Sequence, residues 1–227
     1  MSPILCLLSV ITNSDSSVNI ECKSIDNPEH CCAGGLIGKA LYSSCIISCH
    51  ATGNITGYKS TGGLIGYMES ESRVSGCYTS NNSIEGSTNV GGLVGYMEPD
   101  TMLDNCQSKN ISLKATEENA GGIAGINYGL IMDCHSSGNI EGYQCVGGVV
   151  GRNDGEVYRS DSECIIDGEF AVGGIIGESF GYVSPYDTDD SGDYDKIKFY
   201  GKVEGVETDD PYDVSSDADL LRIVEED

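Results

Sequence analysis

Residues 187–195, DTDDSGDYD, are the stretch of this chain whose residue types and spacing best fit metal chemistry. Side-chain oxygens at alternate positions, with a glycine at the sharp turn, form the first half of an EF-hand-type calcium loop. The twelfth position holds Lys198, where such a loop has a bidentate glutamate. The sequence therefore predicts either a calcium loop or a flexible acidic loop, because charge runs are usually solvated. The calcium ligands would be Asp187, Asp189, Ser191, Asp193 and Asp195.

Other residues that could carry out catalysis do not form a recognisable site. The histidines do not form the His-Glu-x-x-His pair of a zinc peptidase. Glu85 and Glu141 occupy equivalent positions of a repeat, but they are single and no basic side chain recurs beside them, whereas glycosidases need paired carboxylates. The glycine-rich GGLIG segments lack the Lys and Ser/Thr of a phosphate loop. The chain is therefore not expected to be an enzyme, and a polysaccharide-acting β-helix enzyme remains an alternative.

The charge of the chain limits its partners. There are 12 basic and 36 acidic side chains, a formal net charge of −24. Binding to nucleic acid or to an anionic membrane requires basic residues that are missing here. No apolar run approaches the roughly 20 residues of a membrane-spanning helix. An acidic inhibitor that mimics DNA is a second alternative, although the acidity is concentrated in the C-terminal tail instead of following the repeats.

The repeats organise the chain. The phrase Gly-Gly, two aliphatic or small residues, Gly occurs six times, at spacings of 28, 29, 30, 26 and 26 residues. Six copies at a nearly constant period indicate a repeat architecture. The copies are residues 34–38, 62–66, 91–95, 121–125, 147–151 and 173–177.

Two further patterns recur in step with the glycines. The first, aliphatic-x-x-Cys, ends at Cys49, Cys77, Cys106 and Cys134. The second, Ile-x-Gly, begins at Ile55, Ile84, Ile140 and Ile166, and Ile111 is assigned to the same row without the glycine. Each period thus contains three short apolar stretches bounded by turn formers, which are typical of strands.

Three strands per period predict an all-β fold, a parallel β-solenoid of about six three-stranded coils. One coil buries too few apolar side chains, at roughly 1.5 to 3 kcal/mol each, to offset a backbone entropy of about 1 kcal/mol or more per residue, so the coils must stack. Crossover rules favour right-handed coiling. The predicted solenoid covers residues 33–184, after an N-terminal cap or partial first coil at 1–32. Residues 185–227 hold the acidic insertion, a last strand and a short C-terminal capping helix at 216–227.

The cysteine row would stack inside the solenoid about 4.8 Å apart. Disulfides along the row would be strained, because a bridge needs Cβ atoms about 3.8 Å apart. We therefore expect buried free thiols in the core. Bridges among the cysteines outside the row stay open: Cys6, Cys22, Cys31, Cys32, Cys45, Cys145 and Cys164.

The recurring Gly-Leu-Ile-Gly and Gly-Leu-Val-Gly units, together with the Cys-x-Ser-x-Gly-Asn-Ile segment at residues 134–140, resemble the GLUG-motif repeat. The resemblance covers roughly residues 33–184. GLUG repeats occur in bacterial adhesins, haemagglutinin-like proteins and non-catalytic regions of immunoglobulin-A-specific zinc metallopeptidases. The resemblance implies an extracellular or cell-surface location and a non-enzymatic structural or binding module, similar to those of adhesins.

The near-identical phrases GGLIGYMES and GGLVGYMEP predict the stacking register. Tyr67 should lie on Tyr96, Met68 on Met97 and Glu69 on Glu98. Like charges at ladder spacing are unfavourable, so the two glutamates should lie at an exposed turn or share a cation. Stacked Tyr67 and Tyr96 could bind a host protein or a glycan, although cross-strand packing alone would also explain them.

Overall fold

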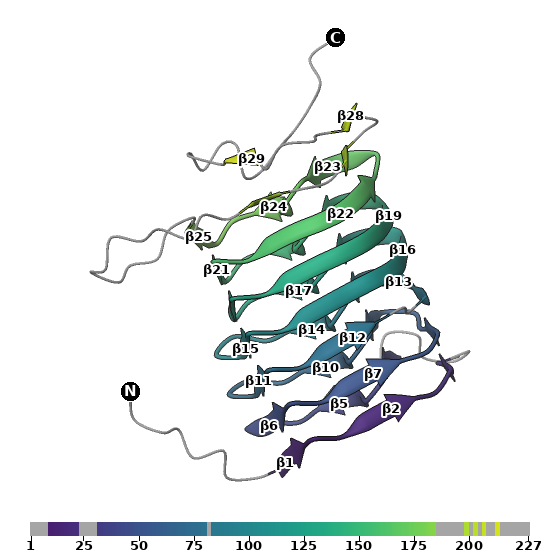
Figure 1. Ribbon diagram of the computed structural model, residues 1–227, viewed down its shortest axis with the longest axis vertical. Coiled ribbons are helices and arrows are strands. Elements are labelled where there is room, and N and C mark those ends of the chain that lie inside the picture. The colour runs from purple at the N-terminus through teal and green to yellow at the C-terminus, as the bar shows by residue number, and fades with distance from the viewer. Residues whose placement is uncertain are drawn as a thin grey trace.

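The chain folds as a parallel β-solenoid, seen in a computed structural model that describes residues 9–22, 31–80, 83–184 and four two-residue strands between 198 and 213. The coils stack along the long axis of the molecule (Figure 1). All strand pairs are parallel except two near the C-terminus, and the described residues contain no helix. The expected capping helix at 216–227 and the acidic run at 187–195 lie outside the described residues.

Three sheets, here called A, B and C, run the length of the solenoid. Sheet A contains β1 (Ser9–Thr12), β6 (Ser44–Ile47), β11 (Arg73–Ser75), β15 (Met102–Asp104), β18 (Leu130–Met132), β21 (Glu156–Tyr158) and β25 (Tyr182–Ser184). Sheet C contains β5 (Ile37–Ala40), β10 (Ile65–Met68), β14 (Val94–Met97), β17 (Ala124–Asn127), β20 (Val150–Asn153) and β24 (Ile176–Ser179). Each strand of sheet C begins at the second residue after a double glycine, so the six GGxxG copies correspond to its six strands.

Sheet B holds the longest strands. Its members are β2 (Asp15–Ser17), β3 (Ile20–Glu21), β4 (Cys32–Gly34), β7 (His50–Thr52), β8 (Ile55–Thr56), β9 (Ser60–Gly62), β12 (Tyr78–Ser80), β13 (Ser83–Gly91), β16 (Gln107–Gly121), β19 (His135–Gly147), β22 (Asp161–Asp167), β23 (Phe170–Gly173), β26 (Lys198–Phe199), β27 (Lys202–Val203), β28 (Val206–Glu207) and β29 (Tyr212–Asp213). The strands β1, β2 and β3 pair with the first complete coil, so residues 9–21 extend sheets A and B.

The GGxxG glycines lie where the chain passes from sheet B to sheet C, and close backbone contacts require them. A Cβ atom on Gly121 would lie 2.0 Å from the carbonyl oxygen of Ala124, and one on Gly122 would lie 2.0 Å from that of Gly148. A Cβ on Gly125 would collide with backbone of the preceding coil. None of these glycines has a positive φ. They therefore provide room for backbone to approach backbone, not an unusual conformation.

The core consists of rows with one residue from each coil. The cysteine row lies between sheets A and B with side chains that are 0 or 1% exposed, and its four members are free thiols: Cys49, Cys77, Cys106 and Cys134. Ser160 continues the row and accepts a hydrogen bond from the Cys134 amide at 3.1 Å. The isoleucine row of sheet B is 0 to 2% exposed at Ile55, Ile84, Ile140 and Ile166.

One assignment within the isoleucine row is wrong. Leu113, not Ile111, is the partner of both Ile84 and Ile140. The register of β16 against β19 shifts between Ser108 and Ile111, and again further along the strand. The coil that contains β16 is the longest, and β-bulges absorb its extra residues. Ile111 is still buried, but it lies in the row of Gly138.

The aliphatic-x-x-Cys pattern has a conformational cause. The residue just before the cysteine, or before its counterpart in other coils, has a left-handed backbone after each of the first six strands of sheet A. The φ values there lie between 41° and 61° at Asn13, Ser48, Gly76, Asn105, Asp133 and Arg159. This bend turns the chain from sheet A into sheet B and directs the following cysteine into the core. Glycine and asparagine adopt this conformation at little cost.

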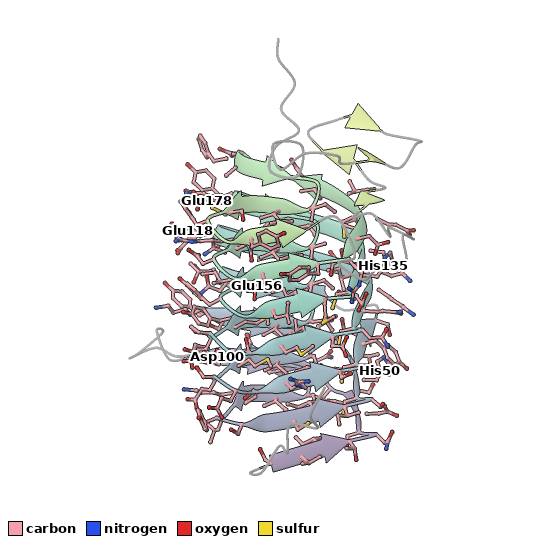
Figure 2. The ribbon with its side chains drawn as sticks, turned by 90° about the vertical axis from the view of Figure 1, so that its left-hand side faces the viewer. His50, Asp100, Glu118, His135, Glu156 and Glu178 are labelled. Atoms are coloured by element: carbon pink, nitrogen blue, oxygen red, sulfur yellow. A yellow bond between two sulfur atoms is a disulfide. The ribbon has the colours of Figure 1, made fainter. Side chains whose placement is uncertain are left out.

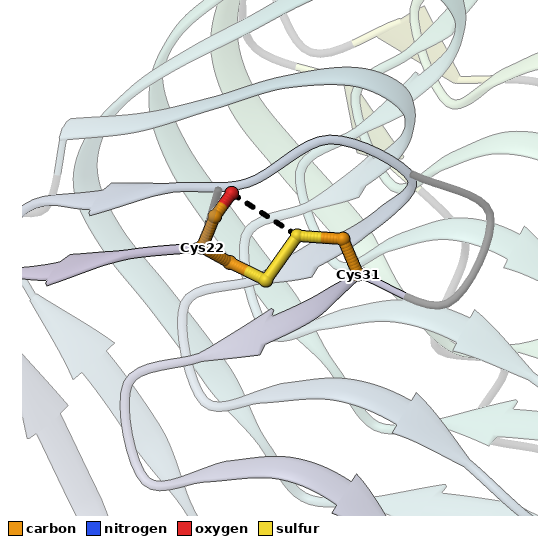
Figure 3. The surroundings of a disulfide bond; sticks show 2 residues. All are labelled: Cys22 and Cys31. Atoms are coloured by element: carbon orange, nitrogen blue, oxygen red, sulfur yellow. Dashed lines mark hydrogen bonds between the residues drawn. A yellow bond between two sulfur atoms is a disulfide. The ribbon is translucent and has the colours of Figure 1, made fainter. Parts of the chain in front are cut away.

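One disulfide links cysteines outside the row. Cys22 and Cys31 are bridged with their Cα atoms 6.1 Å apart (Figure 3). The bridge joins the end of the N-terminal segment to the start of β4, across residues 23–30. The other cysteines of the described part of the chain form no disulfide.

Candidate partner-binding groove

The turn between sheets C and A becomes shorter halfway along the solenoid. Eight positions separate Val94 from Met102 in the third coil, and six separate their partners Ala124 and Leu130 in the fourth. The same change underlies part of the drop in repeat spacing from 30 to 26 residues. A groove begins where the turns shorten.

The floor of this groove is a stack of glycines. A Cβ on Gly155 would lie 2.2 Å from the carbonyl oxygen of Gly129, and one on Gly181 would lie 2.1 Å from that of Gly155. Side chains from the turns and from sheet A form the two sides, and the groove has a volume of about 670 Å³. Its lining comprises Tyr128, Asp154 and Phe180 on the turn side, Leu130, Glu156 and Tyr182 on the sheet A side, and Pro99, Asp100 and Thr101 at the end of the third coil.

The groove lies on one side of the solenoid and is rich in exposed rings and carboxylates. Phe180 is 69% exposed and Tyr182 57% exposed. Asp100 and Glu156 lie on the side that faces the viewer in Figure 2, well away from His50 and His135. The combination offers aromatic surface and negative charge to a molecule outside the chain.

A buried chain of polar side chains supports the floor from below. Asn127 and Asn153 are 0% exposed, and the Asn127 Nδ2 atom donates to Asn153 Oδ1 at 2.8 Å. Asn153 in turn donates to Ser179 Oγ at 3.2 Å. The Gly129 amide donates to Asn127 Oδ1 at 2.9 Å. These bonds hold the glycine backbone in place, because a buried amide is costly to leave unpaired.

Aromatic rings continue from the groove onto sheet C. Tyr67 and Tyr96 stack with ring centroids 4.8 Å apart and planes 4° apart, and Tyr128 follows with its centroid 5.6 Å from that of Tyr96. The pairing of β10 with β14 confirms the predicted register of Tyr67 on Tyr96 and Met68 on Met97. We call Tyr67, Tyr96, Tyr128, Phe180 and Tyr182 the aromatic strip.

The two stacked glutamates avoid each other by binding different partners in the coil before them. Glu69 Oε1 is 2.7 Å from Lys39 Nζ, and Glu98 accepts a hydrogen bond from the Tyr67 hydroxyl at 2.6 Å. The hydrogen bond from Lys39 lowers the pKa of Glu69, and that from Tyr67 lowers the pKa of Glu98. Burial and the Glu98 carboxylate raise the pKa of Tyr67. Both glutamates are half-buried, so the predicted exposed turn is not what relieves their repulsion. The positive charge of Lys39 lowers the pKa of both carboxylates, which agrees with the second alternative, a shared cation.

The outer face of sheet B carries separate ion pairs. Lys114 lies between Glu85 and Glu141 in register and forms an ion pair with Glu141, so a single basic residue neighbours these carboxylates. His135 Nδ1 lies 2.7 Å from Asp161 Oδ1, and this hydrogen bond raises the pKa of His135. These pairs link neighbouring coils.

Tyr67 and Tyr96, the two binding residues predicted from the sequence, both lie on the aromatic strip. The sequence interpretation did not predict the groove. A signal was present: NYGL, NDGE and SFGY recur at a spacing of 26 residues around Gly129, Gly155 and Gly181. The calcium ligands expected at Asp187, Asp189, Ser191, Asp193 and Asp195 lie outside the described residues. Within the described residues, no group of three or more His, Cys, Asp or Glu side chains could hold a metal ion.

Comparison with known proteins identifies the repeat. The family model of the GLUG motif matches residues 29–56 and 116–141. The chain carries GLUG repeats. Both matches end at the isoleucine row of sheet B, at β8 and within β19, after crossing sheets C and A, so one GLUG unit corresponds to about one coil. No curated protein and no solved structure matches the chain, and the described residues include no helix long and apolar enough to cross a membrane.

Proposed function

We propose that this GLUG solenoid is a non-enzymatic binding module of a secreted or cell-surface repeat protein, and that its partner binds along the groove and the aromatic strip. The coils would serve as a rigid support. The GLUG repeats support a location outside the cell, as does the Cys22–Cys31 disulfide, because such bridges persist in oxidising compartments.

The exposed rings of the groove are the observation that carries the proposal. Large aromatic side chains contribute disproportionately to binding energy at protein interfaces, and rings also stack on sugars. Phe180 and Tyr182 together expose more than half of their surfaces beside a groove with a preformed glycine floor. A binding surface on closely stacked backbone loses little conformational freedom when the partner arrives. The partner would be a protein or glycan of another cell or its matrix.

Binding of the labelled full chain to a panel of immobilised matrix proteins and glycans tests this function. Replacing Phe180 and Tyr182 with alanine should remove most of any specific binding, because these rings are exposed and their loss leaves no core cavity. The matched control replaces Tyr143 and Phe170, an exposed aromatic pair whose centroids are 5.3 Å apart on a different corner. Equal binding by both double variants would exclude the groove as the binding site. If the parent chain bound nothing on the panel, the module would be a structural scaffold only.

A further inference from the structure

Two basic side chains of this chain show which surface groups bind a positive charge: an aromatic ring and a carboxylate. Lys39 Nζ lies 4.8 Å from the centre of the Tyr67 ring while it pairs with Glu69 at 2.7 Å. Here a ring and a carboxylate together bind one positive group. Such an arrangement combines cation–π attraction with an ion pair.

The second example lies at the groove. Arg152 Cζ is 5.1 Å from the centre of the Phe180 ring, and its Nε atom is 2.8 Å from Asp154 Oδ2. The hydrogen bond to Asp154 raises the pKa of Arg152, so the guanidinium stays charged. Asp154 is therefore already neutralised by a residue of this chain.

The rest of the groove repeats the same chemistry without a cation of its own. Glu156 is the register partner of Tyr182 on the next coil, and Asp100 lines the same groove. Among the described residues, no lysine or arginine is paired with Glu156 or Asp100. Glu156 does accept a hydrogen bond from the Tyr158 hydroxyl at 3.0 Å, at an exposed position on sheet A.

We propose that the groove binds a basic polypeptide segment, with one lysine or arginine of the partner lying against Tyr182 and pairing with Glu156, and a second one pairing with Asp100, three coils away from Tyr182. This inference rests on the proposed function and names the partner class. The net charge of −24 attracts a cationic partner and disfavours an acidic glycan. Each cation contributes modestly at an exposed site, so a segment with several basic residues would lie along successive coils.

Titration of the full chain with a fluorescent peptide of alternating lysine and serine tests the inference. The comparison probes are a glutamate–serine peptide, a neutral oligosaccharide and an amine-bearing oligosaccharide. We expect the basic peptide to bind, and Glu156→Gln and Tyr182→Ala each to weaken it by about threefold or more. The matched control is Glu117→Gln, which removes the same charge from an exposed position on β16. Circular dichroism verifies that each variant keeps the fold.

The outcomes separate this inference from the proposed function. Equal weakening by Glu117→Gln and Glu156→Gln would mean that the peptide senses only the net charge, and the basic-segment proposal would be wrong. Tighter binding of either oligosaccharide than of the basic peptide, with the same dependence on Tyr182, would identify a glycan site instead. Failure of the basic peptide to bind, while the Phe180 and Tyr182 variants still lose binding to the matrix panel, would overturn this inference and leave the proposed function standing.

Discussion

A single methyl group added at Gly122 should destabilise the solenoid strongly. The Cβ of Gly122→Ala would lie 2.0 Å from the Gly148 carbonyl oxygen and 2.7 Å from Ser136 Cβ. The Gly148 oxygen is backbone and the Ser136 side chain is buried, so neither neighbour can move aside easily. The φ of Gly122 is not positive, so the cost comes from space and not from conformation.

The magnitude follows from what must move. Relieving the contact requires the fourth and fifth coils to separate by more than about 1 Å, and overpacking of this kind costs about 1 to 3 kcal/mol. The same movement weakens the coil-to-coil bonds from Gly122 N to Gly147 O, at 3.2 Å, and from Ile123 N to Val149 O, at 2.8 Å, each worth about 1 kcal/mol. We expect a total loss of about 3 to 5 kcal/mol.

Urea unfolding followed by far-ultraviolet circular dichroism measures this loss. The matched control is Gly76→Ala, because Gly76 has a φ of 61° and its Cβ would meet nothing closer than 3.7 Å. Its cost is the left-handed conformation, about 1 kcal/mol, and Gly76→Asn should be nearly neutral. If Gly122→Ala costs no more than Gly76→Ala, the interpretation of the double glycine as a space requirement is wrong.

Three further predictions concern the polar and thiol rows. Asp161→Asn should cost about 0.5 kcal/mol below pH 6.5 in unfolding experiments, and this cost should disappear as the pH rises through the raised pKa of His135, because that interaction stabilises the fold only while the histidine is protonated. Asn153→Ala should lower the free energy of unfolding by about 1 to 3 kcal/mol, since the Asn127 amide loses its 2.8 Å partner; an unchanged urea midpoint would contradict this. Iodoacetamide should label Cys106 only after denaturation, because contact with the next thiol and burial raise its pKa, and mass spectrometry of the native protein would reveal any exception.

The architecture could be predicted because its signals repeat. Six GGxxG copies, four cysteines and four isoleucines in step establish the coil length and the inward-facing rows, and neighbouring coils then pair through their backbones at a constant spacing. Where one coil departs from its neighbours, local pattern is insufficient. Ile111 and Leu113 both fit an aliphatic row, and only the bulge in β16 decides which one lies beside Ile84.

The candidate site could be predicted only in part for a related reason. The identical context of Tyr67 and Tyr96 makes their stacking a consequence of repetition. Tyr128 and Phe180 occupy a turn position that holds glutamate in earlier coils. Their place in the aromatic strip therefore becomes clear only from the hydrogen-bonded register of neighbouring coils. The Cys22–Cys31 bridge likewise depends on the approach of two segments whose cysteines have no counterpart in the repeat.

The sequence by itself determined that this chain stacks coils, which side chains fill most of the core, and in what register the two near-identical phrases meet, because a repeated phrase can satisfy its backbone and bury its apolar residues only against its own copy. Tertiary structure alone decided how coils of unequal length fit together. The loss of two residues from each turn after the third coil brings Gly129, Gly155 and Gly181 into one stack. That stack leaves a groove between rings and carboxylates, and no single repeat contains it.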